Sequence, residues 1–133
     1  MKNKSLYIAI CLIFALTMTT AVSAQDESNV LGDWYGKLTA GGNSLAIVFH
    51  INKDKEGNLK AKMDSPDQGS FGIGVNKVTF KDSKLVLEVS IVNGKYVGRL
   101  GENEIKGTWH QGGRKIPLNM SRKAPPGPKR PQN

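Results

Sequence analysis

The stretch KLVLEVSIVNGKYVGRL, residues 84–100, decides the fold class of this 133-residue chain. Its first half alternates apolar with other residues, which is the period of a half-buried β-strand. The inward face of this strand is expected to hold Leu85, Leu87, Val89 and Ile91. The dipeptide Asn93–Gly94 follows, a strong hairpin signal because both residues tolerate a positive φ. The stretch therefore predicts two antiparallel strands joined by a tight turn.

The two-residue rhythm continues on both sides of this stretch. Strands are expected over residues 33–40, 44–51, 59–64, 76–80, 84–92, 95–100, 104–110 and 115–120. Consecutive hairpins predict an all-β, antiparallel up-and-down meander of about eight short strands, which can close into a small lipocalin-like barrel. A β-sandwich is the alternative. Pro117 cannot donate to a ladder, so the last strand is expected at or near an edge.

Three glycines lie inside the predicted strands, on their inward face. They are Gly36, Gly98 and Gly107. A strand glycine weakens pairing unless the sheet bends or a neighbouring side chain needs the space. We expect Trp34 and Trp109 to fill that space.

The first 24 residues have the layout of a secretory signal peptide. Lys2 and Lys4 precede an apolar run of eleven residues, and the segment ends in AVSA with Ala24 at the expected cleavage site. That run is too short to span a bilayer comfortably, so we expect cleavage, no stable membrane anchor, and a periplasmic or extracellular location. Cys11, the single cysteine, lies in this segment. The mature chain is therefore expected to have no disulfide and no thiol chemistry.

The remaining sequence divides into three parts. Residues 25–31 are predicted to be a linker, residues 32–121 the β domain, and residues 122–133 a disordered, basic, Pro-rich tail. Residues 25–121 hold 13 basic and 11 acidic side chains, so the net charge of +8 comes mostly from the two ends. This near-neutral body predicts no nucleic-acid partner. The tail is either a solvated end or a weak attachment to an anionic envelope surface, and we favour the former.

The loop MDSPDQGSFGIGV, residues 63–75, is the main candidate site. Pro66 presets φ and Gly69 permits a left-handed residue, so the loop has good turn chemistry. As an active site it would use an Asp64 and Asp67 carboxylate pair, Ser70 as nucleophile and His50 as base. No spacing forces these groups together, and structure is the favoured interpretation. The acidic groups lack the calcium-loop pattern and two histidines are too few for a typical zinc site, so no metal and no cofactor are expected.

Binding is the remaining use of the exposed groups. The candidate ligand-binding residues are Tyr35, Asp64, Asp67, Gln68, Phe71 and Tyr96. They are aromatic or polar residues with no obvious role in the core, and aromatic side chains bind proteins and stack on sugars.

Five segments carry a resemblance to a known family. They are GDWYGKL (32–38), LAIVFHI (45–51), AKMDSPDQGSFGIGV (61–75), GTWHQGG (107–113) and IPLNM (116–120). Together they resemble the small domain that precedes the catalytic domain in many secreted α/β-hydrolases of Bacteroidetes-type bacteria. The opening GDW is also similar to the Gly-x-Trp of lipocalin first strands. One departure is Gly74, where the family often has Pro.

The resemblance implies a non-catalytic accessory domain, because in those hydrolases the nucleophile lies in the domain that follows. The Gly-x-Ser-x-Gly elbow of such enzymes is absent around Ser70. We therefore expect an exported, non-enzymatic binding module whose partner is a protein, a glycan or a small apolar ligand. Two alternatives stay open: a lipocalin-like carrier with an open cavity, and a small hydrolase in which His50 meets Ser70, Asp64 or Asp67.

Overall fold

Residues 26–125, which the computed structural model describes, form ten β-strands and three short 3-10 helices. The elements are η2 (Glu27–Val30), β1 (Gly32–Ala40), β2 (Asn43–Lys53), β3 (Leu59–Ser65), η3 (Pro66–Gln68), β4 (Ser70–Gly74), β5 (Lys77–Lys81), β6 (Lys84–Val89), η4 (Ser90–Val92), β7 (Gly94–Leu100), β8 (Glu104–Gln111), β9 (Arg114–Pro117) and β10 (Met120–Ser121). The all-β prediction is confirmed. Within this part of the chain, no helix has the length and apolar character needed to cross a membrane. The expected signal peptide, residues 1–24, and most of the expected tail lie outside the described residues.

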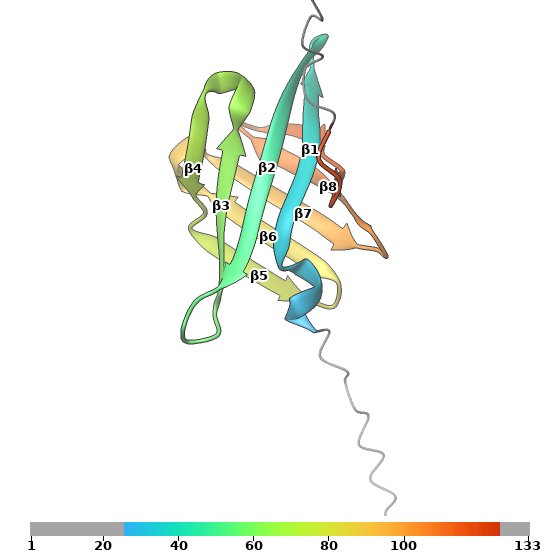
Figure 1. Cartoon of the computed structure of the whole chain (residues 1–133). Coiled ribbons are helices and arrows are strands. Elements are labelled where there is room, and N and C mark those ends of the chain that lie inside the picture. The colour runs from blue at the N-terminus through green and yellow to red at the C-terminus, as the bar shows by residue number, and fades with distance from the viewer. Residues whose placement is uncertain (1–25, 126–133) are drawn as a thin grey trace, which may run out of the picture.

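The strands form one antiparallel sheet in the order β4-β3-β2-β1-β10-β8-β7-β6-β5, with β9 paired to β8. The sheet curls, so that β1–β4 lie across β5–β8 as two layers (Figure 1). The chain passes between the layers at Val75 and Asn76, whose N–H groups donate to the carbonyls of Ala61 and Glu88. Within each layer, strands adjacent in sequence are adjacent in the sheet. The predicted up-and-down meander is therefore confirmed as a curled half-barrel with β4 and β5 at its two ends.

The core lies between the two layers and is filled by large side chains. Its largest fully buried members are Trp34, Phe49, Leu85, Leu87, Tyr96, Ile105, Trp109, Leu118 and Met120. The Phe49 ring lies 5.9 Å from the Tyr96 ring and 6.4 Å from the Trp109 ring, centroid to centroid. Tilted contacts at this separation are favourable for aromatic pairs. These rings occupy the space between the layers.

Tyr96 corrects two of the predictions. The sequence places it on the surface, but it is fully buried, and its hydroxyl donates to the carbonyl of Leu118 at 2.9 Å. Its ring lies over Gly98 and Gly107, which face each other across β7 and β8. Gly98 and Gly107 do make room for an aromatic side chain, but it is Tyr96 and not Trp34 or Trp109, and at Gly36 the space is taken by Leu118 and Met120.

The turn between β6 and β7 also differs from its prediction. The segment Ser90–Val92 is a 3-10 turn, and Asn93 ends it in the left-handed conformation with φ 51°. Ile91, expected to point inward, therefore lies at the tip of a four-residue loop and is 81 % exposed. Gly94 does not adopt a positive φ. It is needed because a Cβ there would collide with the Trp109 ring.

The sequence predicts about eight strands and the structure has ten, and two local features account for the difference. The segment Ser70–Gly74, which its glycines predict to be a loop, pairs with β3 as β4. The expected last strand divides at Leu118 into β9 and β10, and the Leu118 N–H donates to the carbonyl of Gly107. Pro117 ends β9, which pairs only with β8. The expectation of Pro117 near an edge is confirmed.

Both ends of the described chain pack on the barrel, which revises the predicted boundaries. Val30 lies in the expected linker but is fully buried, and its carbonyl accepts from the indole N–H of Trp34 at 2.9 Å. Arg122 lies in the expected tail, yet its guanidinium covers the Trp34 ring at 4.1 Å and donates to the carbonyls of Asn29 and Leu31. The folded unit therefore includes residues on both sides of 32–121.

Candidate functional site

Asp33, His50 and Asp64 form a hydrogen-bonded cluster on the outer face of β1, β2 and β3. The alternation of the strands sends Trp34, Phe49 and Met63 into the core, so the neighbouring positions 33, 50 and 64 point outward. Asp33 lies directly opposite His50, and Asp64 lies diagonally across from it on β3. The Nδ1 atom of His50 is 2.6 Å from Asp33 Oδ1, and its Nε2 atom is 2.6 Å from Asp64 Oδ2.

The two carboxylates set the charge of the imidazole. Hydrogen bonds to Asp64 and then to Asp33 raise the pKa of His50 above its ordinary value and outweigh its partial burial. Burial acts to raise the pKa of Asp64, but the Gly72 N–H and His50 together lower it. When the ring is protonated, each nitrogen donates to a carboxylate, and the cluster is then an imidazolium bridge between three strands.

This bridge brings together residues that the sequence did not place near one another. The hydrolase alternative predicts that His50 meets Ser70, Asp64 or Asp67, and His50 does meet Asp64. A general base for a hydroxyl nucleophile, however, needs one unprotonated ring nitrogen aimed at that hydroxyl. Both nitrogens of His50 are engaged by carboxylates. The arrangement suits cross-strand bonding better than proton abstraction.

The turn of the 63–75 loop is held by its own polar side chains. Ser65 pairs with Ser70 to close it, and the Ser65 hydroxyl donates to the Gln68 side-chain oxygen at 2.9 Å. Gly69 takes the predicted left-handed conformation with φ 65°. The Asp67 carboxylate accepts from the Ala46 N–H of β2 at 2.8 Å, which ties the turn to the neighbouring strand.

A β-bulge beside this turn redirects Phe71. Met63 pairs with Ile73 and Ser65 with Ser70, so two residues of β4, Phe71 and Gly72, face one residue of β3. Gly72 has φ 66°, and its N–H donates to the carboxylate of the facing residue at 2.7 Å. Such a bulge bends a strand and can re-aim a side chain. Phe71 is accordingly 67 % exposed.

The six predicted binding residues therefore separate by location. Asp64, Asp67, Gln68 and Phe71 all lie at the β3–β4 hairpin. Tyr35 lies on the outer face of β1, half-buried, beside a surface pocket that also contains Lys37 and Pro125. Tyr96 belongs to the core.

No metal-binding group is found among residues 26–125. In this part of the chain, no cluster of three His, Cys, Asp or Glu side chains is arranged to hold an ion. Asp33 and Asp64 contact opposite nitrogens of the His50 ring, so their oxygens do not converge with a ring nitrogen on one point.

Sequence reasoning missed two features that alternation could have found. Asp33 was not considered as a partner of His50, although both point outward from paired strands. The second feature is a set of cations on the outer face of β5–β9, where charged residues recur four apart, as in Lys77 and Lys81 or Lys95 and Arg99. Such residues share one face of a strand.

The geometry defines a class: a small curled antiparallel sheet with a filled core, a rigid hairpin and charged outer faces. Comparison with protein-family models, curated proteins and solved structures gives no match to this chain. The resemblance to hydrolase accessory domains therefore remains a prediction.

Proposed function

We propose that this protein is an exported, non-enzymatic binding module that holds a partner protein at the β3–β4 hairpin. One observation carries the proposal: Phe71 is 67 % exposed on a turn that side-chain hydrogen bonds hold in place. We infer the accessory role from the resemblance to domains that accompany secreted hydrolases. We infer export from the signal-peptide pattern of residues 1–24.

The chemistry of the hairpin favours a protein over a glycan. Asp64 and Asp67 are bonded to backbone N–H groups of Gly72 and Ala46, and Gln68 is bonded to Ser65. Glycan recognition needs polar groups around the aromatic ring that can turn toward sugar hydroxyls, whereas each of these three side chains is held by a hydrogen bond within the protein. What the tip presents is an apolar ring. A fixed aromatic side chain buries a large area on binding at low entropic cost, which is typical of a hot spot in a protein interface.

The edge of β4 offers a second element of recognition. This strand is one end of the sheet and pairs only with β3. An open strand edge can accept an additional strand from a partner, with backbone hydrogen bonds supplying affinity and neighbouring side chains supplying specificity. Phe71 lies within β4, so a partner strand added at this edge would lie against the ring.

Two observations weigh against the alternatives. A carrier needs an internal cavity, whereas Phe49, Tyr96 and Trp109 meet in the space between the layers. A hydrolase needs an available base, whereas both ring nitrogens of His50 are bonded to carboxylates. Both observations support a function on the outer surface.

Photo-crosslinking in intact cells tests the proposal. A photoreactive phenylalanine at position 71 should give one discrete adduct with an envelope protein, and the same residue at position 91 is the control. Ile91 is also an exposed apolar residue on a four-residue turn. The isolated partner should then bind Phe71→Ala at least about tenfold more weakly than the wild type, the loss typical of a hot spot. Identical adducts at both positions, or unchanged affinity for Phe71→Ala, would contradict the proposal.

A further inference from the structure

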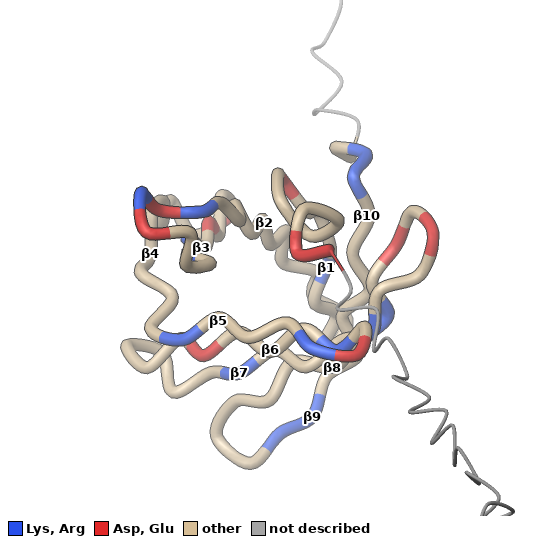
Figure 2. Tube along the Cα trace, turned by 90° about the horizontal axis from the view of Figure 1, so that it is seen from below, with Lys and Arg blue, Asp and Glu red and all other residues tan. Residues whose placement is uncertain are grey.

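The charges of the described chain separate between the two halves of the sheet. Residues 77–117 hold eight Lys and Arg against four Asp and Glu, whereas residues 26–76 hold five against seven. The net charge of the described sheet is therefore small because a basic layer and a slightly acidic layer partly offset each other. Figure 2 shows Lys and Arg positions distributed along the layer that contains β5–β9.

Strand register arranges these cations in two rows across the outer face. The pocket row consists of Lys77, Glu88, Lys95, His110 and Lys115, which pair in that order from β5 to β9. The far row consists of Lys81, Lys84, Arg99 and Lys106, which pair in that order from β5 to β8. Paired strands lie about 4.8 Å apart, so each row presents side chains at that spacing along a line across the strands.

The two rows differ in the order of their charges, since the far row consists of cations alone, whereas Glu88 separates two lysines in the pocket row. In the far row, Lys106 lies 3.5 Å from Glu104, and Arg99 donates to the carbonyl of Asp82. In the pocket row, the three lysines and Glu88 make no ion pair within residues 26–125. Glu88 faces Lys77 and Lys95 on the two neighbouring strands, so the lysines of the pocket row recur on every second strand. A ligand with negative charges at that spacing would supply the partners that these lysines lack.

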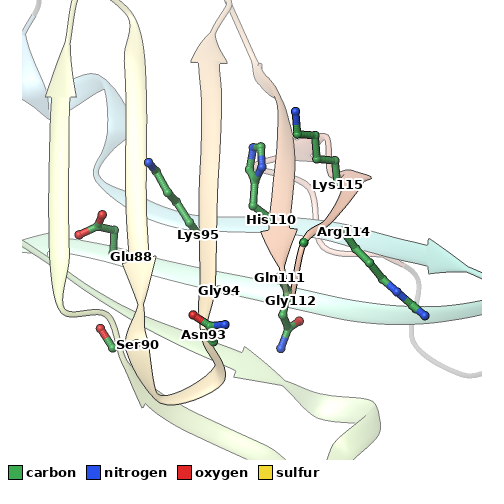
Figure 3. A pocket seen from close by; sticks show the side chains of 11 residues that line it. Glu88, Ser90, Asn93, Gly94, Lys95, His110, Gln111, Gly112, Arg114 and Lys115 are labelled. Carbon is green, nitrogen blue, oxygen red and sulfur yellow. The ribbon is translucent and has the colours of Figure 1, made fainter.

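A surface pocket of about 500 Å³ lies along the pocket row, and every member of the row except Lys77 lines it. Figure 3 shows side chains of Lys95, His110 and Lys115 projecting from neighbouring strands above it. The Gln111 side chain accepts from the Trp109 indole and donates to the carbonyl of Val92, which fixes one wall. The remaining polar lining includes Glu88, Asn93 and Arg114, none of which has a side-chain hydrogen bond or ion pair within the described residues.

We infer that this outer face binds an acidic linear glycan, which lies along the pocket row and places one sugar in the pocket. The lysines lie two strands apart, and one strand spacing is about the length of one sugar unit, so they suit carboxylates that recur at every second sugar along one side of an extended chain. Glu88 and Asn93 suit sugar hydroxyls, which donate to a carboxylate and exchange hydrogen bonds with an amide. This surface is separate from the hairpin, and the inference does not depend on the proposed protein partner.

Other polyanions fit this face less well. Single-stranded nucleic acid is usually bound by aromatic side chains that stack on bases. The positions between the two rows are instead Thr79, Val86, Val97, Thr108 and Pro117. A DNA backbone would place phosphates against Glu88 with no hydroxyl donor to satisfy it. A glycan supplies both carboxylates and hydroxyls.

Binding to polygalacturonate oligosaccharides, measured by calorimetry at fixed salt, tests the inference. The pocket variant Lys95→Gln with Lys115→Gln should lose at least about tenfold in affinity, because each removed cation deletes a charged hydrogen bond. The matched control Lys37→Gln with Lys55→Gln removes the same charge from β1 and the β2–β3 turn and should change affinity less than about twofold. Thermal unfolding of both variants checks that each stays folded.

Four outcomes would overturn the inference. They are no binding of polygalacturonate by the wild type, equal losses in the pocket and control variants, equal binding of a neutral galactan, and tighter binding of single-stranded DNA or phosphatidylglycerol vesicles through the same two lysines. The Phe71→Ala variant should bind polygalacturonate like the wild type, which keeps a failure at this face distinct from a failure at the hairpin.

Discussion

Gly107→Ala is the sharpest test of how the core is built. An ideal Cβ at position 107 would lie 2.5 Å from the Tyr96 hydroxyl oxygen and 2.5 Å from the carbonyl oxygen of Val97. The second contact is to backbone of the paired strand, so no change of rotamer relieves it. Tyr96 cannot swing away freely either, because it is fully buried and bonded to the carbonyl of Leu118.

The expected magnitude follows from two opposing effects. Forcing a methyl group into a packed core costs about 1–3 kcal/mol. Replacing glycine by alanine also removes conformational freedom from the unfolded chain, which stabilises by about 0.4–1 kcal/mol where the native conformation allows it. Gly74→Ala isolates the second effect, because Gly74 is also in a strand, has no positive φ, and has no neighbouring atom within 4 Å of where the added methyl carbon would lie. The unfolded-state effect is common to both variants, so they should differ by the packing cost of about 1–3 kcal/mol.

Urea unfolding followed by circular dichroism measures this difference. Gly74→Ala should unfold at or slightly above the wild-type midpoint, and Gly107→Ala well below it, with equal slopes. For a domain of this size, the difference corresponds to roughly 4 °C or more in Tm. If Gly107→Ala were as stable as Gly74→Ala, the placement of Tyr96 over the paired glycines would be wrong.

Two further predictions concern the hydroxyl of Tyr96 and the charge of His50. Tyr96→Phe should lower the free energy of unfolding by about 1–2 kcal/mol in urea titrations, since it deprives the buried Leu118 carbonyl of its donor; wild-type stability would show that this bond is not made. The pKa of His50 is raised in the folded protein, so protonation of His50 stabilises the fold. This stabilisation is complete below about pH 6.5, the ordinary pKa of histidine, and it is lost as the pH rises through the raised pKa of the folded state. The loss of stability in His50→Gln should thus be larger at about pH 5.5 than at about pH 9, and an equal loss at both would contradict the imidazolium bridge.

The meander could be predicted from the sequence because alternation is a local signal, but the errors in the strand ends share one cause. Ile91 continues the apolar period of β6, yet the chain leaves the strand at Ser90 and turns through η4. The glycines of the SFGIG segment favour a loop, although its pairing with β3 accommodates Gly72 in a bulge. Strand ends depend on which partner strand continues alongside, and that is a tertiary property.

The candidate site was predictable in composition but not in pairing. The turn chemistry of the 63–75 loop and the left-handed Gly69 follow from local rules, and both are present. The contact of His50 with Asp33 and Asp64 depends on the register between β1, β2 and β3, and register is set by the turn lengths and the buried face. Once the register is known, outward alternation alone places the three side chains together.

The same reasoning explains why a nearly neutral body can present a strongly basic surface. Net charge sums over a sequence, whereas a sheet sorts alternate residues onto two faces and then aligns them across strands. Inward positions of β5–β8 are apolar or glycine, so each strand places its cations on the outer face. The acidic residues Asp33 and Asp64 are held by His50 in the other layer, where they cannot neutralise these cations. Charge segregation thus follows from register, and it leaves the pocket row and the Phe71 hairpin as two separate surfaces on different strands.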